Sequence, residues 1–359
     1  MGSIKPVVVI DLFAGAGGFT EGAISAGAKV AVAIDLWEPA VLLHRHNQPN
    51  VLMVQHELGD FRKDVQLIRK YLARYPNHHV HLHGSPPCQA LSNASRTDAS
   101  EGMGMVLHFL NLVDALRPDS WSMENVVPMR KRLPEGTPSV ILNSADFGVP
   151  QTRRRCIAGE GWEAIPTHSK EKWLSTLDAL PHLTDELNNY LRSASILPLH
   201  ALDSFLFHPR QGLMDSGRSS AKTAGINPRT GKKEGGSGPL FRTLDEPSYT
   251  IMSSPRNICV NLDGCGESNS RRAKSADAPI DEPSLTVRGA IGAPSIRDAS
   301  TDKPVKIRSL TVQETAILQS FPSTFEWELP GLRKKDLWTA IGNAVCPPVA
   351  EAIIRGIIQ

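Results

Sequence analysis

Apolar runs alternate with helix-like segments through the first 160 residues. Residues 6–13 and 28–35 are short, nearly continuous apolar runs, which is typical of strands buried on both faces. Residues 79–84 and 120–126 are also strand-like. Helical periodicity occurs at 19–28, 38–47, 61–75 and 104–117, and in the third of these Phe61, Val65, Ile68 and Leu72 share one side. This alternation predicts an α/β fold with a mostly parallel sheet and helices on both faces.

The pattern changes after Gly159. Residues 161–305 are rich in Gly, Ser, Pro and charged residues, with weak periodicity. The phrases LDEPSYTI (244–251) and IDEPSLTV (280–287) each combine a Pro-initiated turn with a short β-like run. They are either two similar hairpins or parts of a β-rich domain that presents Thr250, Arg256, Thr286 and Arg288 to a ligand. The helix-like end of the chain has the small-residue texture of the beginning. We therefore predict a first domain at 1–160, a smaller β-rich domain at 161–325, and a return of 326–359 to the first.

Composition narrows the class of protein. With 359 residues and 40% apolar content, the chain is long enough for two domains with a proper core. The net charge of +2 does not single out a nucleic-acid binder, but residues 210–275 carry 11 Lys/Arg against 6 Asp/Glu. Five cysteines predict a reducing cytoplasmic setting without disulfides, and the apolar run near the N-terminus is too short for a signal peptide or membrane span.

A glycine-rich turn, DLFAGAGGFTEG (11–22), connects the first strand with the first helix. Such turns bring backbone close to a ligand, and dinucleotide folds use the spacing GxGxxG for a pyrophosphate. Thr20 stands where the third glycine would be, so an adenosine ligand without phosphates fits better. Tight packing of helix on strand is the alternative explanation of the glycines.

Residues at the ends of later strands suit the same ligand. Asp35 ends the second strand, where a carboxylate accepts hydrogen bonds from ribose hydroxyls. Leu36 and Trp37 follow and could cover an adenine face. Asp60 and Phe61 are candidates for contacts with the edge of the adenine.

Cys88 follows two prolines after the strand 79–84. Proline restricts the backbone, so the thiol has its position set in advance, as a nucleophile requires. The alternative is an inert core cysteine. Three histidines in the strand, His79, His81 and His83, share one face, but no further ligand cluster accompanies them and we expect no metal.

Six phrases in order make the chain resemble a C5-cytosine-specific DNA methyltransferase of the bacterial or viral restriction–modification type. They are DLFAGAGGFTEG, SPPCQ (85–89), MENV (123–126), QTRRR (151–155), RSLTVQETAILQSFP (308–322) and AIGNAV (340–345). The resemblance covers nearly the whole chain. It implies an S-adenosylmethionine-dependent, Rossmann-like methyltransferase fold in which residues 161–325 form the target-recognition domain. After PCQ the chain has Ala90-Leu91-Ser92, where the family usually has Gly-Phe-Ser or Ser-Phe-Ser, so contacts of this loop are less certain.

The resemblance implies the reaction and its catalytic residues. Addition of the Cys88 thiolate to cytosine C6 makes C5 nucleophilic enough to take a methyl group from S-adenosylmethionine. Glu124 of MENV faces N3 and the amino group of a base flipped out of the helix. Arg153 and Arg155 contact the cytosine O2 or the surroundings of the nucleophile.

The resemblance also implies the ligand contacts. The cofactor residues are Phe13, Ala14, Gly15, Gly17, Gly18, Asp35, Leu36, Trp37, Asp60, Phe61, Pro86, Asn343 and Val345. The DNA contacts are Gln89, Ser92, Arg96, Arg256, Thr286, Val287 and Arg288. We expect a cytoplasmic monomer acting on double-stranded DNA. An RNA cytosine-5 methyltransferase, an inactive methyltransferase-like binding module and a nicotinamide oxidoreductase are the alternatives.

Overall fold

The computed structural model describes residues 5–87, 103–182 and 311–358, and the backbone of short strands between 212 and 306. The chain divides into two compact units. The larger comprises Met1–Leu174, Thr250–Pro255 and Thr315–Gln359, and the smaller comprises Ser175–Tyr249 and Arg256–Glu314. The outer changes between units thus fall at 174/175 and 314/315, compared with 160/161 and 325/326 in the sequence prediction.

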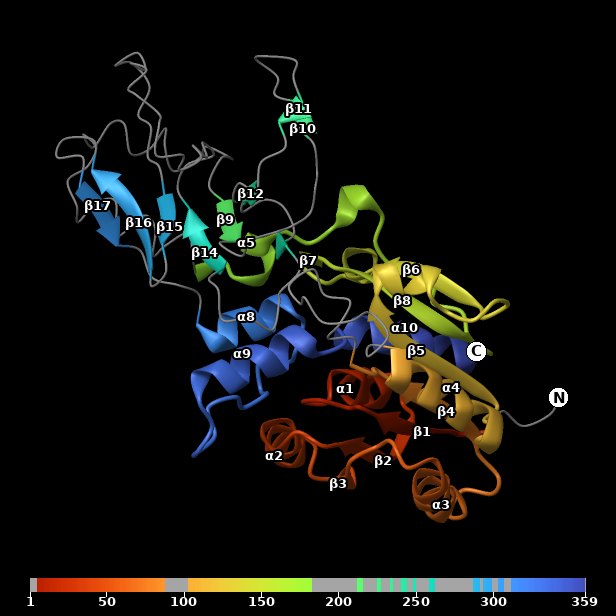
Figure 1. Cartoon of the computed structure of the whole chain (residues 1–359). Helices are drawn as coiled ribbons and strands as arrows, with labels where there is room; N and C mark the ends of the chain where they lie inside the picture. Colours follow the sequence, from red (N-terminus) through yellow and green to blue (C-terminus); the bar gives the residue numbers. More distant parts are fainter. Residues whose placement is uncertain are drawn as a thin grey trace. The chain divides into compact units, whose positions relative to one another are not determined.

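A seven-stranded sheet forms the centre of the larger unit, in the order β3-β2-β1-β4-β5-β8-β6 (Figure 1). Its strands are β1 (Val7–Leu12), β2 (Lys29–Asp35), β3 (Met53–Gln55), β4 (His79–Gly84), β5 (Ser120–Val126), β6 (Ser139–Asn143) and β8 (Arg154–Glu160). Neighbouring strands from β3 to β5 pair in parallel, and β8 is antiparallel to both of its neighbours. The predicted mostly parallel sheet is therefore confirmed.

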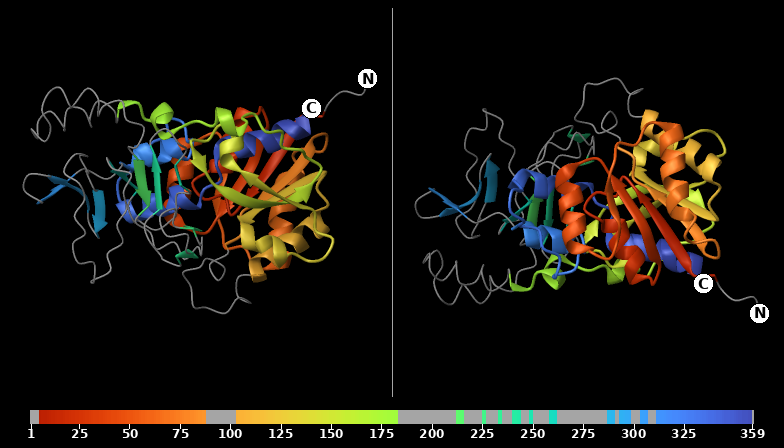
Figure 2. Two further views of the ribbon diagram at one scale, coloured as in Figure 1. Left: turned by 90° about the horizontal axis from the view of Figure 1, so that it is seen from above. Right: turned by 90° about the horizontal axis from the view of Figure 1, so that it is seen from below.

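Helices cover both faces of this sheet (Figure 2). They are α1 (Gly18–Ser25), α2 (Glu38–Asn47) and α10 (Pro347–Ile358) on one face, and α3 (Phe61–Leu72) and α4 (Gly104–Leu116) on the other. Two further helices, α8 (Val312–Leu318) and α9 (Lys334–Asn343), precede α10 in the chain. Alternation along β1 separates two cores: Val7 and Val9 pack with α1 and α10, whereas Val8 and Ile10 pack with α3 and α4.

The buried side of α3 agrees with the predicted one except at its first residue. Ile68 is buried and Val65 and Leu72 pack against the same core, while Phe61 is 43% exposed. Asp64 is buried on this helix as well, because it accepts hydrogen bonds from the Gly59 amide and from His108. Polar partners thus add a carboxylate to the side that apolar periodicity predicts.

The end of the chain returns to the beginning. Helices α1 and α10 lie side by side, in red and blue in Figure 1. Residues Lys334–Ile358 are long and apolar enough to be considered as a membrane span, but more than half of the apolar window is buried, and the chain leaves helical conformation between α9 and α10. These two helices are therefore core elements.

The smaller unit has short antiparallel strands. One sheet has the order β12 (Leu240–Thr243), β9 (Gly212–Asp215), β14 (Ile258–Asn261), and another the order β15 (Val287–Ala290), β16 (Ala293–Asp298), β17 (Lys303–Lys306). Strands β10 (Gly225–Ile226) and β11 (Lys233–Glu234) form a hairpin pair. Strand β13 (Ser248–Tyr249) and helix α5 (Thr176–Ala179) also belong to this unit, whereas the short strand β7 (Gln151–Thr152) belongs to the larger one. The predicted β-rich character of this region is confirmed.

The contact between α1 and α10 gives the first prediction. A side chain at Gly22 would collide with the carbonyl oxygen of Pro347 and crowd Ala350. We expect Gly22→Ala to lower the free energy of unfolding by about 2 kcal/mol, as overpacking does, although alanine favours helix. Urea unfolding measures the change. Gly104→Ala is the control, because no atom lies within 4 Å of the added carbon; equal stabilities of the two variants would contradict the prediction.

Candidate active site

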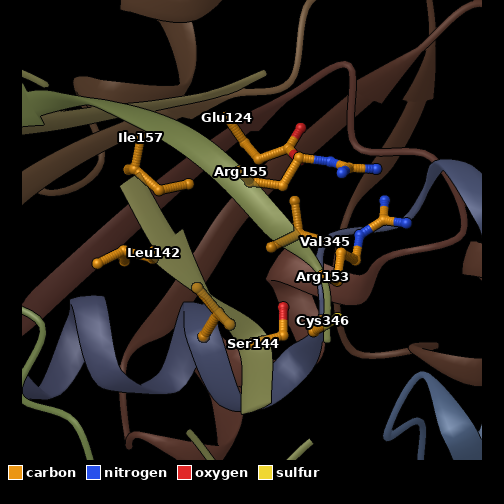
Figure 3. A pocket seen from close by; sticks show the side chains of 9 residues that line it. Glu124, Leu142, Ser144, Arg153, Arg155, Ile157, Val345 and Cys346 are labelled. Atoms are coloured by element: carbon orange, nitrogen blue, oxygen red, sulfur yellow. The ribbon is translucent and has the colours of Figure 1, made fainter. Parts of the chain in front are cut away.

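Glu124 and Arg155 form an ion pair at the end of β5. The two residues lie on neighbouring antiparallel strands, β5 and β8. Arg155 Nε is 2.8 Å from Glu124 Oε1, and their side chains are 20% and 11% exposed. Figure 3 shows the pair beside Arg153 and Val345 in a small pocket. Because water screens this pair little, Arg155 fixes the orientation of the Glu124 carboxylate.

Arg153 ties the C-terminal segment to the same pocket. Its buried guanidinium donates through Nη2 to the carbonyls of Gly342 at 3.0 Å and Ala344 at 3.2 Å. Gln319 donates to the Ala344 carbonyl as well, at 2.8 Å. Burial, with the nearby charge of Arg155, lowers the pKa of Arg153 to about 10, so it stays charged at neutral pH. Sequence analysis placed Arg153 near the cytosine O2 or the surroundings of the nucleophile, and that role stays a prediction; these two backbone carbonyls are among its partners.

Asn125 connects β5 with the segment before Cys88. Its Nδ2 donates to the carbonyl of Pro86 at 3.2 Å, and its Oδ1 accepts from the Val126 amide at 2.9 Å. The side chain is buried. Sequence analysis assigned no role to Asn125, although it stands next to Glu124 in MENV. The Pro86 carbonyl, expected to face the cofactor, has this amide as a partner.

The glycines of the turn have different roles. A side chain at Gly17 would crowd Gln48 and His44, and one at Gly18 would collide with the Val345 carbonyl. These two glycines permit close packing. Gly15 has a φ of 58°, and among the described residues no atom lies within 4 Å of an added carbon, so of these three glycines Gly15 borders open space in the described part of the structure. Phe13 also has a left-handed backbone, with a φ of 55°, which is a strained conformation typical of binding sites.

Asp35 joins this turn to the end of β2. Its two carboxylate oxygens accept hydrogen bonds from the Gly15 and Trp37 amides, each at 2.8 Å. Burial raises the pKa of Asp35. The next residue, Leu36, is 55% exposed, and Phe61 at the start of α3 is 43% exposed. The larger unit therefore offers a carboxylate and two apolar side chains that are open to solvent, which suits a partly apolar ligand with hydroxyl groups.

Asp60 begins α3 as its N-cap. It accepts from the Lys63 amide at 3.2 Å and pairs with the Lys63 ammonium at 2.9 Å. These interactions, the side-chain contact first, lower the pKa of Asp60. The carboxylate is thus exposed and ionised beside Phe61, at the edge where an adenine was expected.

Comparison with known proteins decides the family. The model of the C-5 cytosine-specific DNA methylase family matches residues 7–359. The chain belongs to this family. It is 26% identical over 370 residues to the Type II methyltransferase M.HindV of Haemophilus influenzae, covering 98% of this chain and 96% of that protein. Over 173 residues it is 31% identical to DNA (cytosine-5)-methyltransferase 1 of Rattus norvegicus, covering 41% of this chain and 11% of the rat protein.

Solved structures agree on the fold. The crystal structure of the Dnmt2 methyltransferase of S. pombe superimposes with a TM-score of 0.53 and 15% identity, covering 98% of both chains. At this identity the likeness concerns the fold alone. It agrees with the helix-covered, mostly parallel sheet of this methylase.

Several predicted site residues meet within the larger unit, and others lie elsewhere. Glu124, Arg153, Arg155 and Val345 line one pocket, while Asn343 is exposed at the end of α9. The predicted residues Cys88, Gln89, Ser92, Arg96, Arg256 and Thr286 lie outside the described residues. Val287 and Arg288 belong to β15 of the smaller unit, where the backbone alone is described. Among the described residues, no group of three or more His, Cys, Asp and Glu side chains is placed to hold a metal ion.

Asp11 is a further residue that sequence analysis did not assign to the site. It is fully buried at the end of β1, and its Oδ2 accepts from Thr20 Oγ1 at 2.8 Å. Thr20 Oγ1 in turn lies 3.2 Å from His44 Nε2. The signal was present in the sequence, because Asp11 is the one acidic residue inside an otherwise apolar strand of the methylase. Burial, the largest effect, raises its pKa from 3.8 to about 7.

The link from Asn125 to Pro86 predicts an effect on catalysis. We expect Asn125→Ala to lower kcat about tenfold with little change in KM for the methyl donor, because the segment before Cys88 loses its anchor. Steady-state methylation with labelled donor measures it. The control is Asn143→Ala, which removes a side-chain amide from β6 instead of β5. Equal effects of the two variants on kcat would contradict a specific role of Asn125.

Asp11 predicts a pH-dependent stability. Its carboxyl titrates near 3.8 in the unfolded chain and near 7 in the folded one, so its favourable contribution is lost as pH rises between these values. Asp11→Asn cannot ionise and keeps an acceptor for Thr20. Relative to the parent, its free energy of unfolding should increase by about 3 kcal/mol from about pH 5 to about pH 8. Urea unfolding at both pH values measures this, and a constant difference would contradict it.

Proposed function

We propose that this methylase transfers a methyl group from S-adenosylmethionine to C5 of a cytosine in a short sequence of duplex DNA, through a covalent bond between Cys88 and C6. The proposal rests on one observation: Glu124 and Asn125 are neighbours on β5, and the first lines the pocket while the second binds the segment before Cys88. Glu124 faces the pocket beside Arg155. Asn125 holds Pro86, two residues before Cys88. One strand thus supports both partners that the reaction needs.

The proposed chemistry divides one difficult step into two easier ones. Cys88 loses its proton and the thiolate adds to C6, while Glu124, which takes up a proton when the base displaces Arg155, donates it to N3 and so relieves the negative charge on the ring. C5 then takes the methyl group, and N3 returns its proton to Glu124 when the ring is restored. Loss of the C5 proton and departure of the sulfur restore the aromatic ring, so each turnover releases one proton.

Arg155 has two roles in this scheme. Before the base enters, its Nε neutralises Glu124 at 2.8 Å. The entering cytosine then competes for the carboxyl group, and the guanidinium is free to donate to O2 of the base, which is an acceptor. Arg153 acts indirectly, because it holds the Gly342 and Ala344 carbonyls and so keeps Val345 in the pocket wall.

The described residues fit the proposed cofactor. Gly15 borders open space, Asp35 presents a buried carboxylate, and Leu36 and Phe61 leave apolar surface exposed. A ribose with an adenine suits this set, whereas close packing at Gly18 makes a pyrophosphate a poorer match. When bound, S-adenosylmethionine supplies an electrophilic methyl group on a sulfonium. Phe13, Ala14, Gly17, Trp37, Asp60, Pro86, Asn343 and Val345 complete the proposed binding set.

We assign two groups of residues to DNA binding, one at the site of the flipped-out cytosine and one that reads the surrounding sequence. The target cytosine must leave the helix, which costs a few kcal/mol. We assign Gln89, Ser92 and Arg96 to the opened duplex, and Arg256, Thr286, Val287 and Arg288 to reading of the sequence. The excess of basic residues in 210–275 supports phosphate contacts there. Relatives named Type II methyltransferases support an enzyme of a restriction–modification system. We propose that it acts as a monomer in the cytoplasm.

Trapping of the adduct tests the proposal. DNA that contains 5-fluorocytosine cannot lose a proton from C5, so the enzyme should remain covalently bound to it in the presence of methyl donor. We expect a stable complex for the parent and a loss of at least about a hundredfold for Cys88→Ser, because serine is a far weaker nucleophile. Denaturing gel electrophoresis measures the complex.

Cys156→Ser is the control for this experiment. Cys156 is a buried thiol in β8, and its variant should still form the complex. A complex that persists in Cys88→Ser, or that maps to another residue, would refute the assignment. Labelled methyl transfer to duplex DNA and to tRNA, compared in parallel, separates DNA from RNA as substrate.

A further inference from the structure

A continuous row of hydrogen bonds joins β4 to β5 inside the larger unit. Histidines of β4 alternate with serines, and the row runs in the order His79, Ser120, His81, Ser122, His83, Ser85, here named the His–Ser ladder. The five contacts between ring nitrogen and hydroxyl measure, in this order, 2.8, 2.8, 2.9, 2.8 and 3.1 Å. Register explains the row, because His81 pairs with Ser120 and His83 with Ser122 across the two parallel strands.

The middle of the ladder is closed to solvent. His81, His83 and Ser122 are fully buried, and Ser120 is 1% exposed. Phe19 of α1 lies flat on the ring of His83, with centroids 3.4 Å apart and planes within 5°. On the neighbouring strand β1, Val9 pairs with His81 and Asp11 pairs with His83. Asp11 is thus the ionisable side chain of β1 nearest to the ladder's inner half.

The ladder's bonding pattern is that of a proton-conducting chain. In His81 and His83 both ring nitrogens contact a serine oxygen. A neutral imidazole donates from one nitrogen and accepts at the other, and a hydroxyl does both. Every group can therefore point the same way along the row, in either of two directions, with every hydrogen bond kept. Desolvation lowers the pKa of His81 to about 3 and that of His83 well below its usual value, so both rings are neutral.

The two ends of the ladder reach different places. His79 stands at the amino end of β4 and is partly exposed. Ser85 follows β4 directly, three residues before Cys88. On β5 the next side chain on the same face after Ser122 is that of Glu124, because alternate residues of a strand share a face. The row therefore leads from solvent to the edge of the sheet that carries the proposed catalytic groups.

We propose that the His–Ser ladder is a proton relay between the active site and solvent. This inference rests on the proposed function, in which methylation of a carbon that bears hydrogen releases one proton in each turnover. A methyl group bound to a sulfonium replaces the hydrogen at C5, the positive charge of the sulfonium disappears, and the hydrogen leaves as H⁺. In a site that is closed over a base, this proton needs a path out.

The relay moves one proton without leaving charge behind. A proton that reaches Ser85 Oγ displaces the hydroxyl hydrogen of Ser85 to His83 Nε2, and His83 passes its Nδ1 hydrogen to Ser122. Ser122 passes its hydroxyl hydrogen to His81 Nε2, and His81 passes its Nδ1 hydrogen to Ser120. Ser120 then passes its hydroxyl hydrogen to His79 Nε2. His79 finally releases its Nδ1 hydrogen to water. Each ring has then exchanged one N–H for the other, and rotation of the hydroxyls with return of the ring hydrogens resets the row.

The competing explanation is a purely structural zipper between β4 and β5. A structural zipper also gives each buried polar group of the row a hydrogen-bond partner, but it does not need the hydrogen bonds to point the same way along the row. The two explanations differ in the rate at which the reaction proton appears in solvent. Ser122 separates them best, because it bonds to both buried histidines and can be exchanged for a residue of almost the same size.

The test compares Ser122→Ala with Ser122→Thr under single-turnover conditions on duplex DNA. Labelled donor reports methyl transfer, and a pH indicator in weakly buffered solution reports proton release by stopped flow. In the parent and in Ser122→Thr, whose hydroxyl restores the row, we expect proton release to follow methyl transfer directly. In Ser122→Ala we expect release to lag behind methyl transfer by about tenfold or more, at the low end of effects of proton-transfer groups.

Each outcome decides the question. Proton release that keeps pace with methyl transfer in Ser122→Ala overturns the relay, whether or not the variant is slower or less stable, and assigns a structural role. If Ser122→Ala fails to fold, Ser85→Ala at the partly exposed inner end makes the same comparison. Failure of the proposed function looks different, because the parent itself would then transfer no methyl group to DNA.

Discussion

Close approach of the C-terminal segment to the first helix is the constraint on which the site depends. Gly18 and Gly22 of α1 have backbone carbonyls of Val345 and Pro347 where a side chain would be. Just before Val345 in the chain, the Ala344 carbonyl accepts hydrogen bonds from Arg153 and Gln319, and the Gly342 carbonyl accepts one from Arg153. Without this contact, Val345 would not line the pocket of Glu124 and Arg155. The glycine turn therefore serves two purposes: Gly15 borders space for a ligand, while its neighbours permit packing.

Burial of polar groups is the second theme of the larger unit. Several buried charges are held by specific partners: Glu124 by Arg155, Arg153 by carbonyls, Asp64 by His56, His108 and the Gly59 amide. Where burial is deepest, neutral forms are favoured, as in Asp11, His81 and His83. The sheet thus carries neutral, hydrogen-bonded groups through its interior and keeps charge at its carboxyl edge, where the chemistry of the family needs it.

Division of the chain into two units matches the two tasks that we propose for this methylase, catalysis and reading of a DNA sequence. The larger unit contains the sheet, the turn and the pocket, and the family match extends over both units. The smaller unit is built from short antiparallel strands, whose loops vary with little effect on a core. One catalytic sheet can therefore accompany different recognition surfaces.

Local pattern determined much of this protein. Most strand and helix positions from 6 to 126 and the family follow from short-range periodicity and from phrases whose residue types the chemistry requires. Tertiary structure decided the rest. That Arg153 reaches the carbonyls of Gly342 and Ala344, that the Asp64 carboxylate turns inward and that the histidines of β4 meet serines of β5 depends on residues as many as 191 positions apart. Strand register and the return of the C-terminal segment to the first helix bring such partners together, and no single short stretch of the sequence determines either.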